Sequence, residues 1–123
     1  MFREWNSHRI VESESWPGVE FIIARITFGR RLELLKRVRD LAVKLEYFDA
    51  GRDEKNRIEA SLLGAQLDRL YIEWGLEDIR GLHIDGDPAT PESLVARGPE
   101  DLFLEVLAVI KSECGLNEQE RKN

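Results

Sequence analysis

Apolar and polar residues alternate along residues 9–27, RIVESESWPGVEFIIARIT, and this alternation predicts two β-strands. Between them lie Pro17 and Gly18, which favour a tight turn because proline fixes φ and glycine accepts a positive φ. The second half of the segment is rich in β-branched residues, which also favour a strand. The pattern therefore predicts an N-terminal β-hairpin.

The second predicted strand is apolar on both faces. Residues two apart in a strand share a face, so one face carries Val19, Phe21 and Ile23 and the other carries Ile22, Ala24 and Ile26. Such a strand needs cover on both sides, which a helix and another protein chain would provide. We therefore expect Phe21, Ile22 and Ile23 to contribute to partner binding.

The hydrophobic period changes at Thr27, a suitable helix N-cap. Over residues 28–49 apolar side chains recur at steps of three and four, at Leu32, Leu35, Val38, Leu41, Ala42, Leu45 and Phe48. A second helix is predicted from Asp53 to Gly75. It carries two apolar stripes and so needs two neighbours. A short loop joins the two helices, which predicts an antiparallel helical hairpin.

The C-terminal third predicts short extended pieces over residues 76–90, followed by one or two helices. Thr90 and Pro91 form a helix start signal, and Gly98-Pro99 form another. Residues 117–123 are polar and predict a frayed tail behind a single globular domain of residues 1–116. The expected fold class is α+β and mostly helical, with a β-hairpin, a helical hairpin and C-terminal helices.

Composition indicates a small acidic protein of one domain. The chain has 123 residues, 42% of them hydrophobic, and a formal net charge of −6. Residues 25–44 carry seven basic and two acidic side chains, whereas residues 73–105 carry nine acidic and two basic ones. Such an asymmetry can steer association with a charged partner or a second copy. Met1–Ile10 lacks the apolar core of a secretion signal and the chain has one cysteine, so we expect a cytoplasmic protein and no membrane segment.

The best candidate for chemistry is GLHIDGDPATPESL, residues 81–94, which holds His83, Asp85 and Asp87 at alternate positions. Zinc needs at least three protein ligands in fixed geometry, and calcium loops need further acidic residues that are missing here. Asp-Gly is a strong turn signal, so we interpret the segment as a structural turn. Cys114, at a helix end, is interpreted as a packing residue. We expect no catalytic residue, no metal and no cofactor.

Arg30, Arg37 and Lys44 are spaced by seven residues and form one line along the predicted helix 28–49. Such a line can face a phosphate backbone, which makes a small nucleic-acid-binding regulator the alternative function. Glu33 and Asp40 interrupt the same helix and no aromatic residues interleave, so nucleic acid is the less favoured partner. The three basic residues are also candidates for protein partner binding.

The order of the elements resembles that of small proteins from tailed-phage and prophage gene clusters, in particular phage tail assembly chaperones. The residues that carry this resemblance are Trp74-Gly75-Leu76, Gly81-Leu82, Asp85-Gly86, Ala89-Thr90, Gly98-Pro99 and Glu120-Arg121-Lys122-Asn123. The resemblance implies a non-enzymatic, self-associating helical protein of the host cytoplasm that binds the tape-measure and tail-tube proteins during tail morphogenesis. It also implies that a longer, frameshifted form can occur.

Overall fold

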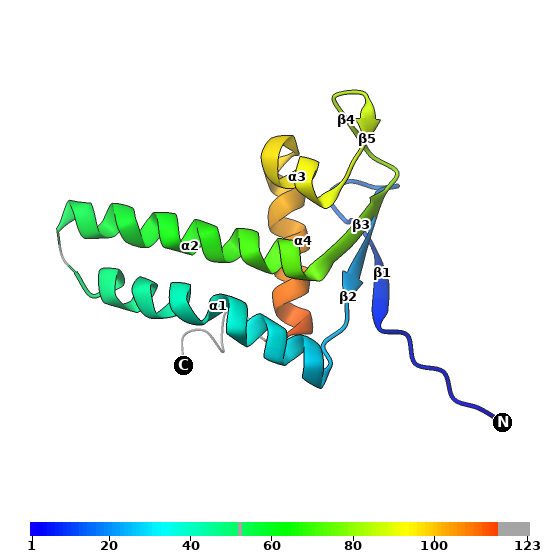
Figure 1. The fold of residues 1–123 in the computed structure, drawn as a ribbon. Helices are drawn as coiled ribbons and strands as arrows, with labels where there is room; N and C mark the ends of the chain where they lie inside the picture. The colour runs from blue at the N-terminus through cyan, green and yellow to red at the C-terminus, as the bar shows by residue number, and fades with distance from the viewer. Residues whose placement is uncertain (52, 116–123) are drawn as a thin grey trace.

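The computed structural model describes residues 1–51 and 53–115, and the predicted tail of residues 117–123 lies outside them. The fold is α+β and 57% helical, as predicted. Figure 1 shows its elements, which are β1 (His8–Glu12), β2 (Glu20–Ala24), α1 (Phe28–Asp49), α2 (Glu54–Gly75), β3 (Leu76–Arg80), β4 (His83–Ile84), β5 (Asp87–Pro88), α3 (Pro91–Arg97) and α4 (Glu100–Glu113).

The predicted N-terminal hairpin is confirmed as β1 and β2, but it is part of a larger sheet. The strand order is β1-β2-β3 and both pairings are antiparallel, so β2 is the central strand. Phe21 lies opposite Ile79, and the register shifts between Ile22 and Ile23. The sequence predicted an extended segment after Gly75 without indicating its pairing partner. The structure shows that α2 runs directly into the third strand.

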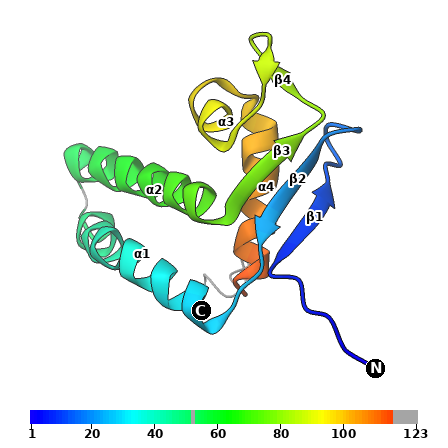
Figure 2. The same cartoon turned by 45° about the vertical axis from the view of Figure 1, so that its right-hand side comes forward.

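Helices α1 and α2 form the predicted antiparallel hairpin, and its loop end extends away from the sheet (Figures 1 and 2). Both predicted N-caps are present. The Thr27 hydroxyl accepts the Arg30 N–H at 3.2 Å, and the Asp53 carboxylate accepts the Asn56 N–H at 2.8 Å. A side-chain acceptor at this position satisfies one of the free amides of a first helical turn.

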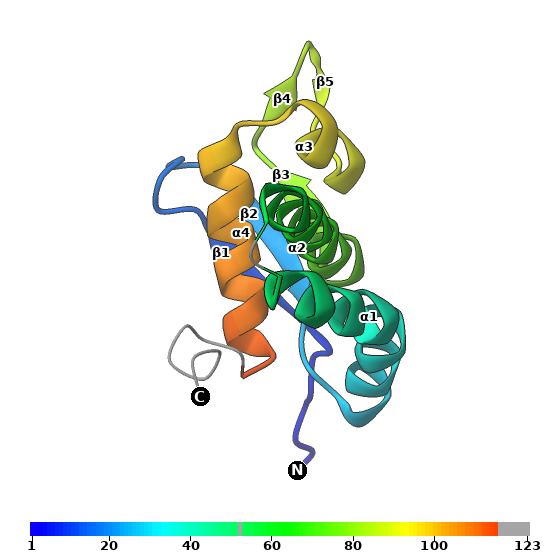
Figure 3. The same ribbon diagram turned by 90° about the vertical axis from the view of Figure 1, so that its left-hand side faces the viewer.

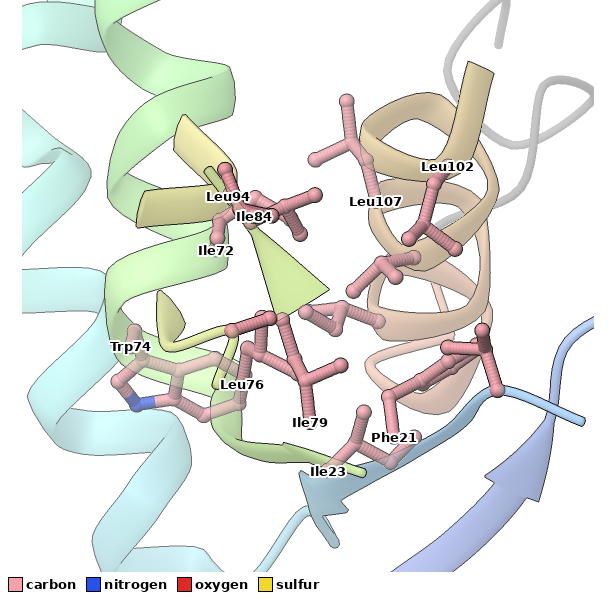
Figure 4. Packing of buried hydrophobic residues seen from close by; sticks show 14 of the residues in the cluster. Phe21, Ile23, Ile72, Trp74, Leu76, Ile79, Ile84, Leu94, Leu102 and Leu107 are labelled. Carbon is pink, nitrogen blue, oxygen red and sulfur yellow. The ribbon is translucent and has the colours of Figure 1, made fainter. Parts of the chain in front are cut away.

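Helix α4 lies across one face of the sheet, as Figures 2 and 3 show. The core between them contains Phe21, Ile23 and Ile79 from the sheet and Leu102 and Leu107 from α4 (Figure 4). The same buried cluster continues to Ile72 and Trp74 at the end of α2, to Leu76 at the start of β3 and to Leu94 of α3. The sheet and the base of the helical hairpin therefore share one core.

The loop between β1 and β2 is held against α4 by one carboxylate. Glu105 accepts hydrogen bonds from the Ser13 hydroxyl and from the Glu14 backbone N–H, both at 2.7 Å, and a third from the Ser15 hydroxyl. Burial raises the pKa of Glu105, but these hydrogen bonds outweigh that effect and leave the pKa below its usual value of 4.5. The loop conformation is therefore coupled to the position of α4.

The start of α3 is a capping box. Thr90 accepts the Ser93 N–H at 3.1 Å, and the Ser93 hydroxyl accepts the Thr90 N–H at 2.9 Å. Pro91 occupies the first helical position, as predicted. The sequence identified Thr90 and Pro91 but not the reciprocal role of Ser93.

Replacing Thr90 with alanine should lower the free energy of unfolding by about 1 kcal/mol, because the N–H of Ser93 loses its acceptor. Chemical denaturation of the variant and the parent protein measures this difference. Serine at position 90 keeps a hydroxyl acceptor and serves as the control. Equal losses for alanine and serine would show that the hydrogen bond does not stabilise α3.

Candidate protein-binding surfaces

Two of the three strand residues expected to bind a partner belong to the core. Phe21 and Ile23 are 0% exposed and lie between the sheet and α4, so they present no surface to another chain. Ile22 lies on the opposite face of β2 but is also buried, at 8%. The expected role of Phe21 and Ile23 in partner binding does not agree with this burial, because their face of β2 packs in the core, where β2 contacts both α2 and α4.

The basic line on α1 is partly engaged within the molecule. The Arg30 guanidinium lies 4.7 Å from the centre of the Trp74 ring and also donates to the Trp74 carbonyl oxygen. Glu33 forms ion pairs with Arg30 at 3.2 Å and with Arg37 at 2.9 Å. Arg30 thus fixes the start of α1 to the end of α2. Of the three predicted residues, only Lys44 lies away from this cluster, exposed near the loop end of the hairpin.

The helical hairpin carries the largest exposed apolar side chains of its two helices on its outer surfaces. They are 46–85% exposed and comprise Phe28, Leu32, Leu35, Val43 and Tyr47 on α1 and Ile58 and Leu62 on α2. Exposed single apolar residues are common, whereas several on one flank of a helix make that flank a candidate interaction surface. We call these seven residues the hairpin stripe.

Helix α1 has two apolar faces, and this corrects the single stripe predicted from the sequence. The face toward α2 consists of Leu34, Val38, Leu41, Leu45 and Phe48, at helical steps of four and three. Leu32 and Leu35 were predicted to share that face. They lie outside it and are exposed, because the buried position in the first turns is Leu34.

The two apolar stripes of α2 require two neighbours. Helix α2 has both of these neighbours only near its C-terminal end. There Ile72 is fully buried, in the region where α3 and α4 contact α2. Toward the loop, Ile58 and Leu62 belong to the same stripe but are more than half exposed. The stripe continues through Ala65 into a cleft of about 440 Å³ between α2, α3 and α4, lined by Val95, Phe103 and Leu104 among others.

A second groove lies between the two helices of the hairpin. Its volume is about 190 Å³, and its lining residues include Val38, Ala42 and Leu45 of α1 and Gly64 and Leu67 of α2. A Cβ atom added at Gly64 would meet no atom within 4 Å, so this position leaves an open hollow. The helical hairpin therefore combines exposed apolar ridges with a shallow apolar groove.

The segment HIDGD forms the predicted turn. Residues 85 and 86 connect β4 to β5, and both have positive φ, 54° at Asp85 and 89° at Gly86, as a two-residue hairpin turn of this type requires. Asp85 pairs with Arg97 at 3.0 Å. No group of three or more His, Cys, Asp or Glu side chains that could hold a metal ion occurs among residues 1–51 and 53–115.

Acidic side chains line a cleft of about 730 Å³ between the end of α2, β3 and α3. Glu73, Glu77, Asp78 and Glu92 contribute to its walls, and Arg69 pairs with Glu73 at 2.8 Å. These residues belong to the acidic segment 73–105. The cleft therefore has a charge opposite to that of α1, and its walls do not provide a nucleophile with an adjacent base.

Cys114 is buried at the end of α4 within the core cluster, as expected for a packing residue. Burial raises the pKa of its thiol to about 11, an effect that the positive charges of Arg31 and Arg30 only partly oppose. Because the thiolate is the reactive species, the thiol is nearly all protonated, and hence inert, at neutral pH.

In the native protein Cys114 should react with a thiol reagent such as dithionitrobenzoate at least 100-fold more slowly than free cysteine at pH 7.5. The reaction should accelerate steeply as the pH approaches the raised pKa of the thiol, about 11. In denaturant the thiol should react at the rate of free cysteine, which controls for reagent quality. Fast labelling of the native protein would show that Cys114 is accessible and ionised.

No family of known proteins, no curated protein and no solved structure matches the chain in comparisons with each of these three sets. No helix within the described part of the chain has both the length and the apolar content of a membrane span.

Proposed function

We propose that this chain is a non-enzymatic protein-binding adaptor that holds an amphipathic helix of its partner on the helical hairpin. The observation that carries the proposal is the hairpin stripe, whose seven apolar residues are 46–85% exposed although the molecule has a well-packed core elsewhere. Burial of such side chains at an interface contributes about 25 cal/mol for each Å² of apolar surface removed from water.

An α-helix is the partner element that fits the hairpin best. The exposed apolar residues of α1 lie at steps of four and three from Phe28 to Leu35 and at a step of four from Val43 to Tyr47. Each series therefore lies on one flank of its helix, and the apolar face of an amphipathic partner helix can pack against such a flank. Each helix of the hairpin has 22 residues, so a partner helix of several turns can lie along it. From Leu62 the apolar path continues through Ala65 into the cleft beside α3 and α4, which extends it from the hairpin toward the rest of the molecule.

The sequence resemblance to phage tail assembly chaperones narrows the proposal to one client. A tape-measure protein is long and helical, and its apolar side needs cover before the tail is assembled. An exposed apolar hairpin on a protein of net charge −6 suits that task, because the charge keeps the complex soluble. Tail-tube subunits are the second partner implied by the same resemblance.

The alternative, nucleic-acid binding through α1, has less support. Glu33 engages both Arg30 and Arg37, and the Arg30 guanidinium stacks on Trp74. A phosphate group would have to displace these intramolecular contacts. Strong salt dependence of binding to DNA or RNA is the property that would favour this alternative.

The test uses the tape-measure protein encoded in the same gene cluster, co-expressed with this chain. We expect the double variant Ile58→Glu/Leu62→Glu to lower the soluble yield of the client and to weaken its affinity at least tenfold. The matched control is Ser61→Glu/Gln66→Glu, which adds the same charges at exposed positions of α2 outside the stripe. Circular dichroism of both variants confirms that the fold is unchanged.

Two results would contradict the proposal. If the stripe variant bound the client as tightly as the control, the hairpin would not be the binding surface. If no neighbouring gene encoded a tail protein, the tape-measure assignment would fail. The helix-binding proposal would then be tested with the proteins that those neighbouring genes encode.

A further inference from the structure

The first strand of the sheet has a free edge. The strand order places β1 outside β2, and no other strand of the described chain pairs with β1. Figure 2 shows β1 at the border of the sheet, with the N-terminal residues leading away from it rather than across it. An unpaired edge of this kind is a template for a further strand.

The backbone groups that this edge presents can be identified from the ladder. Ser13 donates its N–H to Val19 and Ser7 accepts from the Arg25 N–H, so odd-numbered residues of this strand bond to β2. In an antiparallel pair, the backbone N–H and C=O groups of successive residues point alternately toward the partner strand and away from it. The N–H and C=O groups of His8, Ile10 and Glu12 therefore point outward.

We propose that a second copy of this chain pairs with this edge, β1 against β1, in antiparallel orientation about a two-fold axis at Ile10. In this register Ile10 faces Ile10 of the second copy, and His8 faces Glu12 of the second copy. The outward groups of His8, Ile10 and Glu12 then all form hydrogen bonds across the interface. The two three-stranded sheets become one continuous sheet in the dimer.

The side chains of β1 are self-complementary in this register. His8 and Glu12 flank Ile10 on one face, so each end of the interface brings an imidazole next to a carboxylate. Ile10 is 52% exposed in the single chain and lies beside Ile22 of β2. The dimer aligns these isoleucines in one row across the sheet, and the HRIVE strand has no net charge with His8 neutral. The other face keeps its contacts, because Arg9 pairs with Glu113 at 3.4 Å.

This interface is separate from the helical hairpin, so a dimer leaves the hairpin stripe free for its partner. The inference does not rest on the proposed function. Variants of Ile58 and Leu62 should leave the dimer intact, and variants of β1 should leave client binding to a single chain intact. Failure of one proposal is therefore distinguishable from failure of the other.

The first test is the mass of the full chain by sedimentation equilibrium from 10 µM to 1 mM. We expect concentration-dependent formation of a species of twice the chain mass of 14.2 kDa. Ile10→Pro removes the outward N–H at the axis without removing a bond to β2, as an edge position tolerates. It should raise the dissociation constant at least tenfold. A monomer throughout this range would overturn the proposal.

The second test fixes the register with single cysteines and mild oxidation. Ile10→Cys should form a disulfide with its own copy, because paired Cα atoms lie about 5.5 Å apart, within disulfide range. His8→Cys alone should not, because its copy lies about 14 Å away along the strand. A mixture of His8→Cys and Glu12→Cys chains should form the mixed dimer. Cross-linking of His8→Cys to itself, or no cross-linking of Ile10→Cys, would overturn this register.

Discussion

Alanine at position 81 is expected to lower the free energy of unfolding by about 3 kcal/mol, because it combines backbone strain with a steric clash. Gly81 has φ +81°, a conformation that L-residues with a side chain rarely adopt. A Cβ atom at this position would lie 2.4 Å from the carbonyl oxygen of Gly18. That oxygen belongs to the turn between β1 and β2, so the turn and the end of β3 would have to separate.

Gly18→Ala is the matched control for this prediction. Gly18 has φ +91°, but an added Cβ would meet no atom within 4 Å. Gly18→Ala should therefore lower the free energy of unfolding only by the cost of backbone strain, about 1 kcal/mol. Urea denaturation of both variants measures the difference of about 2 kcal/mol that belongs to the clash. Equal losses of unfolding free energy for Gly81→Ala and Gly18→Ala would show that the Gly18 carbonyl oxygen does not lie against position 81 in solution.

The elements that the sequence predicted correctly are those specified by local chemistry. Thr27, Asp53 and Thr90 each cap the helix that they were expected to start or precede. Asp85-Gly86 forms a two-residue turn for the same reason, since the residue types themselves favour the required φ angles. These signals act over three or four residues and need no knowledge of the tertiary structure.

Long-range pairing was not predictable in the same way. Nothing local to residues 76–80 indicates that they lie beside β2, and the contact is between residues about 55 positions apart along the chain. The hydrogen bond from the Glu14 N–H, in the turn between β1 and β2, to the Glu105 carboxylate likewise joins residues 91 positions apart. A single sequence shows that Glu105 is acidic and lies on a helix, but not which donors surround it.

The candidate site was predicted only in part, because one periodicity fits more than one face of a helix. In α1, Leu32 and Leu35 are three residues apart and Leu34 and Val38 are four apart; both spacings suit one face of a helix, and only packing against α2 decides which pair is covered. The second stripe of α2 was recognised as needing a neighbour, and the structure shows where that neighbour is missing. The signal for the hairpin stripe was therefore present in the sequence as an excess of apolar positions.

The second large effect is expected for Glu105→Gln, which should lower the free energy of unfolding by about 2 kcal/mol at neutral pH. Hydrogen bonds to a charged acceptor are stronger than those to an amide oxygen, and Glu105 accepts several from residues 13–15. Glu46→Gln makes the same chemical change at an exposed position of α1 and should be nearly neutral. A similar loss for both variants would contradict the role of the loop contact.

The effect of Glu105→Gln should also depend on pH in a defined direction. The pKa of Glu105 lies below 4.5 in the folded protein, because hydrogen bonds from Ser15, Glu14 and Ser13 outweigh the opposing effect of burial. A lowered folded-state pKa means that the carboxylate stabilises the fold fully above the unfolded-state pKa. This stabilisation is lost as the pH falls from about 4.5 through the folded-state value. Denaturation curves should therefore separate the parent and the variant at pH 7 and bring them together in acid. A difference that stayed constant down to pH 2 would show that the charge of Glu105 does not hold the loop against α4.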